Sequence, residues 1–459
     1  MISALALPAL LSLLVDPILS LVDTAYVGRG LGAINLAALG PCTSIFHFSF
    51  NTFRSLTQST TALVSTSLAA GDKEKAGQIV QQMYLIACVL GAGLQATLLT
   101  QAPSILALMG AGPSTPLFPN ASAYLKIRAL AAPAVLIIMV SEGVFRGHAD
   151  TKAPAVAALS AAAANVVLDP IFMFALSMGI AGAAGATACA QFFAASIYGV
   201  MLWRGARKGT MEVPFFFSRE GRKNRRVEAA TGAGGDPLGE VKAWPLLVTV
   251  ISANAAMLLR TTSLMASWSV ATAIATRMSP ASVGAHQVAL SLWLLCALVA
   301  EAPSVAAQVL GSRYIGQGKL ETARSMARRV ATLTMVCSGM LGTTLLAFSG
   351  IIPRGFTSDP DVLNRLRRLL PLLALQQPLI AMTFVAEGLL VGAGQFRWLG
   401  ATTVLTSAVS TCLILLVGSR APHWDVLGIW GGITAMFVGR LLAATWRVFD
   451  RKKGPYWVL

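Results

Sequence analysis

Long, uninterrupted apolar blocks constrain the fold of this chain more than any other feature. Residues Ala153–Ala164, for example, run almost directly into the apolar stretch Val166–Met178. A helix needs about 20 apolar residues to cross a bilayer, whereas a membrane β-barrel shows short segments of alternating polarity. Only 12% of the residues are charged, against about 25% in ordinary soluble domains. The sequence therefore excludes a disordered chain, disfavours a soluble enzyme and predicts an all-α integral membrane protein.

Twelve such blocks can be drawn along the 459 residues, so we predict twelve transmembrane helices. The spans of the first half are predicted at 5–27, 40–69, 78–100, 122–145, 154–177 and 182–203. Those of the second half are predicted at 244–272, 283–312, 329–352, 369–392, 398–419 and 426–448.

A basic, glycine-rich break separates the two halves. It carries five Lys and Arg between Arg219 and Arg226, followed by a run rich in glycine at 231–235. Such a composition is typical of a flexible linker. We therefore divide the chain into an N-lobe at 1–203, a cytoplasmic linker at 204–243 and a C-lobe at 244–459.

Short motifs recur at nearly constant spacing in the two halves. The segment Glu142–Gly147 at the end of span four matches Glu387–Gly392 at the end of span ten, at an offset of 245 residues. The segment Gly71–Ala76 matches Gly318–Ala323 at an offset of 247 residues. The lobes are therefore predicted to be pseudo-symmetric six-helix bundles in the same orientation, which is a transporter architecture.

The basic residues indicate how the chain is oriented in the membrane. Most of the 35 Lys and Arg fall in the even-numbered loops and in the C-terminal tail. Because cytoplasmic loops carry an excess of Lys and Arg, both termini and the linker are predicted on the cytoplasmic side. The same loops explain the net charge of +16, so we expect no nucleic-acid partner.

Catalytic and cofactor patterns are absent from the sequence. No Walker A, HExxH or GxSxG motif occurs, so we predict neither an enzyme nor direct drive by ATP. The six cysteines are scattered through apolar segments without a CxxC pair, which predicts no metal site and no disulfide framework. No signal or transit peptide is visible in the apolar opening, Met1–Leu21.

Four polar residues of the N-lobe lie within predicted spans. Asp16 and Asp23 are almost two helical turns apart in span one, and Asn165 and Asp169 share one helix face in span five. A charge at bilayer depth costs about 2.5–3.5 kcal/mol, so such residues usually cluster or carry function. Clustered acids away from water resist being ionised together, so they can exchange a proton or release it for Na⁺. Alternatively, Asp16 or Asp23 caps its helix at the membrane boundary.

The C-lobe spans contain an arginine and two acids, Arg260, Glu301 and Glu387. One interpretation is a structural ion pair between Arg260 and one of the glutamates. The other is functional, with Arg260 binding an anionic substrate or the glutamates taking up protons. His286, at the start of span eight, is predicted to be interfacial.

Several segments together resemble the multidrug and toxic compound extrusion (MATE) transporters. The segments that carry the resemblance are Val22-Asp23-Thr24, Leu36–Gly40, Arg146–Lys152, Asn165–Pro170, Ala285-His286-Gln287 and Ala306-Ala307-Gln308. The branch most resembled is the group like DNA-damage-inducible protein F, which includes plant and algal citrate or phenolic exporters. The resemblance implies twelve helices in two lobes, a central cavity and antiport driven by H⁺ or Na⁺. It also implies cation-coupling roles for Asp23, Asn165 and Asp169. Glu301 and Glu387 stand where related plant sequences tend to have Asp.

These observations favour a secondary antiporter that exports a small organic solute in exchange for H⁺ or Na⁺ and needs no other cofactor. The acids of the N-lobe favour an organic cation as substrate, whereas Arg260 favours an organic anion such as citrate or a phenolic acid. The alternatives are a flippase for lipid-linked precursors from the same superfamily and a membrane scaffold without transport. We expect a monomer in the plasma membrane or an organelle, with the chloroplast envelope suggested by the branch resemblance.

Overall fold

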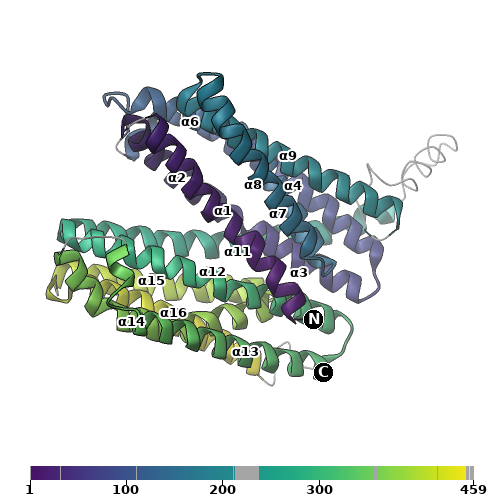
Figure 1. Ribbon diagram of the computed structural model, residues 1–459. Helices are drawn as coiled ribbons and strands as arrows, with labels where there is room; N and C mark the ends of the chain where they lie inside the picture. Colours follow the sequence, from purple (N-terminus) through teal and green to yellow (C-terminus); the bar gives the residue numbers. More distant parts are fainter. Residues whose placement is uncertain are drawn as a thin grey trace. The chain divides into compact units, whose positions relative to one another are not determined.

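The computed structural model describes residues 2–31, 33–109, 111–209, 211, 237–355, 360–420, 422–450 and 454. Within these ranges every element is a helix (Figure 1). The first half contains α1 (Ile2–Gly30), α2 (Ala33–Phe53), α3 (Ser55–Ala69), α4 (Lys73–Thr100), α5 (Ala102–Leu108), α6 (Phe118–Ala129), α7 (Ala132–Gly147), α8 (Lys152–Pro170), the π-helical turn η1 (Ile171–Ala175) and α9 (Gly179–Arg207).

The second half follows the same scheme. It contains α11 (Pro237–Met278), α12 (Pro280–Gly316), α13 (Leu320–Ala347), η3 (Ile352–Gly355), α14 (Pro360–Gly392), α15 (Phe396–Arg420), η4 (Pro422–Trp424) and α16 (Asp425–Phe449). Each of the twelve predicted spans falls on one of these helices or on a consecutive pair, so the predicted all-α, twelve-span fold is confirmed. By length and apolar composition alone, nine helices of the described ranges could cross a membrane, or ten if the bent pair α6–α7 counts as one span.

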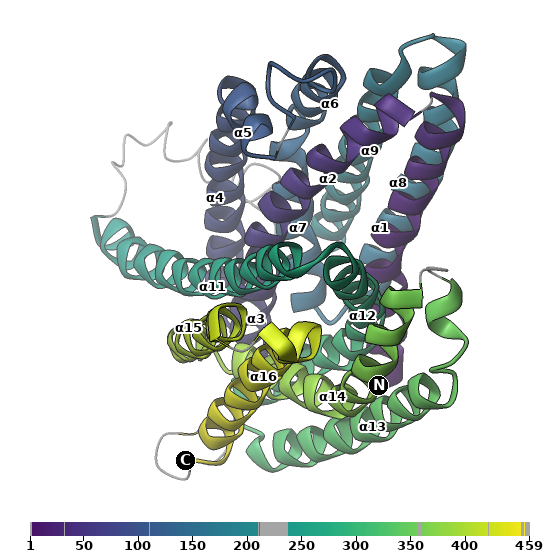
Figure 2. The ribbon, with the colours of Figure 1, turned by 90° about the vertical axis from the view of Figure 1, so that its left-hand side faces the viewer.

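The chain forms two compact units, one of Leu11–Ile251 and one of Met1–Leu10 with Ser252–Leu459. We refer to them as the N-unit and the C-unit. The lobe limits 1–203 and 244–459 stay predictions, and residues 212–236 of the linker lie outside the described ranges. In the C-unit, α14 packs against α12, α13 and α16 (Figure 2).

Three spans of the N-unit are interrupted, two of them at a proline. Helices α2 and α3 meet at Arg54, and α6 and α7 meet at an angle of 46°, just before Pro133 in the first turn of α7. Pro170 ends α8 and is followed by the π-helical turn η1. A proline cannot donate a backbone hydrogen bond, so the α-helical ladder loses a bond one residue after Asp169.

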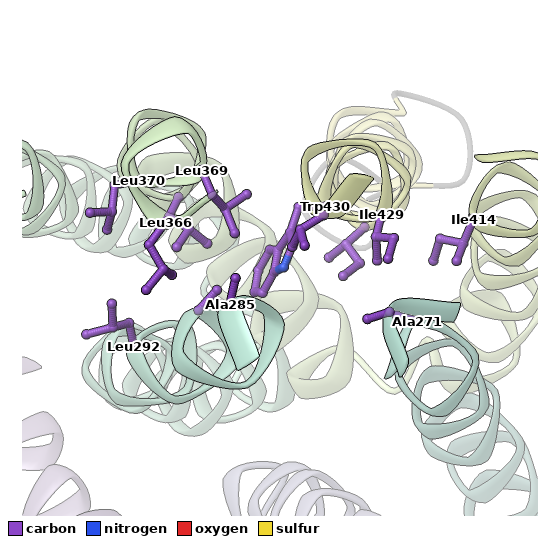
Figure 3. Packing of buried hydrophobic residues seen from close by; sticks show 14 of the residues in the cluster. Ala271, Ala285, Leu292, Leu366, Leu369, Leu370, Ile414, Ile429 and Trp430 are labelled. Carbon is purple, nitrogen blue, oxygen red and sulfur yellow. The ribbon is translucent and has the colours of Figure 1, made fainter. Parts of the chain in front are cut away.

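The largest apolar cluster of the C-unit is formed by α11, α12, α14, α15 and α16 (Figure 3). Leu366, Leu369 and Leu370 of α14 line one side of it, and Trp430 of α16 reaches toward the helix that carries Ala285. Many large apolar side chains also lie outside the cores, such as Leu405 and Leu442, which are 65% and 64% exposed. Exposed leucine is expected where lipid, rather than water, covers a helix.

Corresponding glycines in the two repeats lie at close helix crossings. A Cβ atom at Gly143 of α7 would lie 2.8 Å from the carbonyl oxygen of Thr57 in α3. A Cβ atom at Gly388 of α14 would lie 2.6 Å from the carbonyl oxygen of Ser304 in α12. The repeat found in the sequence therefore marks equivalent contacts, in which the absence of a side chain lets two backbones approach.

Gly392 of α14 provides a test of this packing. A Cβ atom there would lie 2.5 Å from the carbonyl oxygen of Gln308 and 3.1 Å from the amide nitrogen of Ser312. We expect Gly392→Ala to destabilise the protein by about 1–3 kcal/mol, because both obstacles are backbone atoms. Thermal unfolding of the purified protein would measure the loss. Gly339→Ala on α13 is the control, since a Cβ there meets nothing within 4 Å; equal losses in the two variants would contradict the prediction.

Candidate functional site

The polar residues predicted in spans one and five meet inside the N-unit. The side-chain amide of Asn165 donates one hydrogen bond to Asp23 Oδ1 at 3.0 Å and another to Asp169 Oδ2 at 2.9 Å. Asn165 and Asp169 are fully buried, and Asp23 is partly buried. One amide from α8 therefore links an acid of its own helix to an acid of α1.

This acid–amide cluster of Asp23, Asn165 and Asp169 has unused acceptor atoms. The Oδ1 atoms of Asn165 and Asp169 are buried and have no hydrogen-bond partner within the described part of the chain. Carboxylate and amide oxygens are the ligands that hard cations prefer. The cluster can therefore accept a proton or a small cation.

The local sequence explains why the cluster forms at this point. Asn165 and Asp169 are four residues apart on a regular part of α8, so their side chains lie on one face. Pro170 and η1 follow at once, where the helix departs from α-helical geometry. Asp169 thus occupies the last regular turn of its helix, next to Pro170, which has no backbone N–H to donate.

Arg128 is a further charged residue of the N-unit, and the sequence analysis did not single it out. Its guanidinium interacts electrostatically with the Asp23 carboxyl, donates a 3.0 Å hydrogen bond to the Tyr124 hydroxyl and lies 4.7 Å from the ring centroid of Phe46. The residue lies near the end of α6, just before the bend to α7. Its position inside the fourth predicted span is the signal that could have identified it.

The C-unit holds a second charged group, the arginine pair of Arg260 and Arg440 around Glu387. Arg440 binds Glu387 through two hydrogen bonds, from Nε at 2.8 Å and from Nη2 at 2.7 Å. Arg260 donates from Nη2 to Oε2 of the same carboxylate. All three side chains are buried. The ion pair that one interpretation of Arg260 predicted is present, and Arg440 adds a second cation that the sequence analysis did not list among the candidates.

The remaining candidates lie elsewhere. Glu301 lies on α12 and is partly buried. The carboxylate that Arg260 and Arg440 bind is that of Glu387. The side chain of Asp16 lies outside the described residues. His286, predicted at the membrane interface, has a fully buried side chain, 3.1 Å from the Thr272 hydroxyl and 5.9 Å, between ring centroids, from Trp430. The tertiary packing of α16 on α12 removes His286 from the surface.

Comparisons with known proteins agree with this architecture. The MatE family matches residues 8–171 and 256–416. The chain is 30% identical over 468 residues to Protein DETOXIFICATION 44, chloroplastic, of Arabidopsis thaliana, which covers 100% of this chain and 83% of that protein. It is 32% identical over 200 residues to DNA damage-inducible protein F of Escherichia coli, which covers 44% of this chain and 43% of that protein. A MATE transporter of Vibrio cholerae, solved in its bent form, matches with a TM-score of 0.82 and 19% identity over 100% of this chain and 98% of that chain.

Proposed function

Since the chain belongs to the MatE family, the multidrug and toxin extrusion transporters, we propose that it is an antiporter that exports a small organic anion in exchange for H⁺ or Na⁺. The family membership makes the protein an integral membrane transporter and not an enzyme. The coupling ion and the charge of the solute are the parts that we add.

The acid–amide cluster is the observation that carries the coupling proposal. Two acids linked by one amide, with two unpartnered buried oxygens in the described part of the chain, form a place where one positive charge is stabilised. Binding of H⁺ or Na⁺ lowers the cost of closing the protein around the acids, because burying uncompensated charge is unfavourable. Each charge that crosses the membrane contributes about 2.3 kcal/mol per 100 mV to the cycle.

The arginine pair supports an anionic solute. Arg260 and Arg440 together carry two positive charges against the single negative charge of Glu387. A planar guanidinium binds carboxylate in a two-pronged geometry, which suits an organic acid such as citrate or a phenolic acid. The acids of the N-unit leave a xenobiotic cation as the competing substrate class. A flippase for lipid-linked precursors is disfavoured, since its anionic cargo gives no role to buried acids.

Flux into sealed proteoliposomes tests this function. We expect uptake of an organic carboxylate or of an organic cation to require an imposed H⁺ or Na⁺ gradient. Radiolabelled citrate, a radiolabelled aromatic carboxylate and a fluorescent organic cation would be compared under each gradient, with protein-free liposomes as the control. Gradient-driven flux of a carboxylate supports the proposal. Flux of the cation alone would overturn the anionic substrate, and flux that ignores both gradients would overturn antiport.

The cellular setting is also part of the proposal. The names of two similar Arabidopsis thaliana proteins, DETOXIFICATION 44 and DETOXIFICATION 45, include the word chloroplastic. These names support a location in the chloroplast envelope, and the plasma membrane is the alternative. We place both termini on the cytoplasmic side or its equivalent because of the Lys and Arg bias of the loops. We propose that the transporter acts as a monomer within the bilayer.

A further inference from the structure

An open hollow lies over the first turns of α13 in the C-unit. It has a volume of about 400 Å³ and is lined by Glu321, Arg324, Ser325, Arg328 and Arg329. We call it the arginine hollow. It lies at the start of the ninth predicted span, 329–352, where a membrane helix leaves the hydrocarbon core and passes between the lipid headgroups.

The charges of the arginine hollow are only partly balanced. Glu321, whose side chain is 89% exposed, pairs with Arg324. Arg328 and Arg329 are exposed, and neither has an ion-pair partner in the described part of the chain. Three guanidiniums against one carboxylate leave a formal charge of +2 in the hollow. Its electrostatics therefore favour an anionic ligand.

The sequence repeat shows that the fold does not need these arginines. Helix α13 corresponds to α4 of the N-unit at the offset of 247 residues. The buried faces of the two helices match position by position, with Ala76, Ile79, Met83 and Ala87 in α4 and Ala323, Met326, Val330 and Thr334 in α13. In α4 the positions equivalent to the three arginines are uncharged and hold Gly77, Gln81 and Gln82. The arginines are therefore a feature of one repeat, and the shared packing does not account for them.

The face of α13 that carries the arginine hollow continues as an apolar strip of Met335, Val336 and Gly339. Met335 and Val336 lie about two helical turns beyond Arg328 and are 46% and 55% exposed. One turn further, a Cβ atom added at Gly339 would meet nothing within 4 Å. Exposed apolar side chains of a membrane helix are covered by lipid tails. The hollow and the strip together suit a molecule with a charged head and an apolar tail.

We infer that the arginine hollow binds the headgroup of an anionic phospholipid, whose acyl chains lie along the apolar strip. Arg328 and Arg329 bind the phosphate oxygens, since a planar guanidinium can donate two parallel hydrogen bonds to phosphate. The hydroxyl of Ser325, in the same hollow, adds a neutral donor. A free phosphate ion would use the hollow alone, so the strip favours the lipid.

This lipid site shares no residue with the acid–amide cluster or with the arginine pair. It therefore depends neither on the coupling ion nor on the charge of the solute, and it can be tested without transport. The lipid that it selects is defined by charge, because basic residues near a membrane surface attract anionic headgroups over zwitterionic ones.

Native mass spectrometry of the purified full-length protein in detergent measures this selectivity. Dioleoyl phosphatidylglycerol, which is anionic, and dioleoyl phosphatidylcholine, which has the same acyl chains but no net charge, are titrated separately. We expect the parent protein to bind its first phosphatidylglycerol at least about tenfold more tightly than its first phosphatidylcholine.

Arginine variants locate the site. The double variant Arg328→Gln with Arg329→Gln places in α13 the residues that α4 holds at the equivalent positions, so it should fold as the parent protein does. We expect it to lose the preference for phosphatidylglycerol, a change of about tenfold. The matched control is Arg367→Gln with Arg368→Gln, which removes two adjacent exposed arginines of α14 that do not line the hollow and should keep the preference.

The result that supports the inference is a preference that disappears in the α13 variant and persists in the α14 variant. No preference in the parent protein, an unchanged preference in the α13 variant or equal losses in the two variants would overturn it. Inorganic phosphate that displaces phosphatidylglycerol at equal concentration would also overturn it, since the hollow would then be a site for the free ion.

Discussion

Replacement of Asp169 by Asn is expected to abolish gradient-driven transport while the protein remains folded. The new side chain has the same shape and can still accept the hydrogen bond that Asn165 donates at 2.9 Å. It cannot be ionised, so the cluster of Asp23, Asn165 and Asp169 loses the negative charge that attracts a proton or Na⁺. A charged hydrogen-bonding interaction is worth about 1.5–3 kcal/mol, which corresponds to roughly tenfold to hundredfold weaker ion binding.

The measurement is the initial rate of uptake in proteoliposomes under the gradient that drives the parent protein. Asp72→Asn is the matched control, because Asp72 caps the exposed start of α4 by accepting from the backbone N–H of Lys75 at 3.0 Å. Asparagine is an equally good cap, so this variant should transport normally. An Asp169→Asn protein that still transports at the parent rate would show that coupling does not depend on this acid.

Replacement of Glu387 by Gln is expected to cause the largest loss of stability among the variants named here. Glu387 is 4% exposed and lies between two buried guanidiniums. Removal of its charge leaves Arg260 and Arg440 buried together without an anion, and breaking a buried ion pair in this way costs about 3–5 kcal/mol.

Thermal unfolding followed by tryptophan fluorescence would detect the loss, since Trp430 is fully buried in the folded protein. The control is Glu321→Gln, which removes the partner of Arg324 at a site where the glutamate side chain is 89% exposed. Surface pairs of this kind contribute at most about 1 kcal/mol.

The double variant of Glu387→Gln with Arg440→Gln should recover part of the loss, because only one unpaired arginine then remains. Equal unfolding temperatures for Glu387→Gln and Glu321→Gln would show that the charge of Glu387 is not needed to keep the two arginines buried in the folded protein.

The candidate sites could be predicted from the sequence only in part. Depth within an apolar span identified Asp23, Asn165 and Asp169, and the spacing of four residues placed two of them on one face. The same depth argument pointed to Arg260 and Glu387 but left open whether they pair. It did not predict the roles of Arg128 and Arg440, whose acidic partners lie in other helices far along the chain.

His286 illustrates the limit most clearly. Its position at the start of a predicted span indicated a membrane interface, yet the packing of α16 on α12 buries it beside Trp430. The indole N–H groups of Trp293 and Trp430, which are buried without an acceptor among the described residues, likewise could not be predicted, because a hydrogen bond depends on which atoms reach each other in space.

The two-fold repeat of long apolar helices, and the presence of charged residues within its predicted spans, follow from the sequence alone. These properties follow from local composition, since a run of about 20 apolar residues must form a helix in lipid to satisfy its own backbone. Only the packing of the helices against one another decides which charges neutralise one another, that one amide links two acids, and that tryptophans from three helices pack together. Those features depend on how each helix is rotated about its axis and at what angle it crosses its neighbours. The periodicity of one helix in the sequence does not determine either of these.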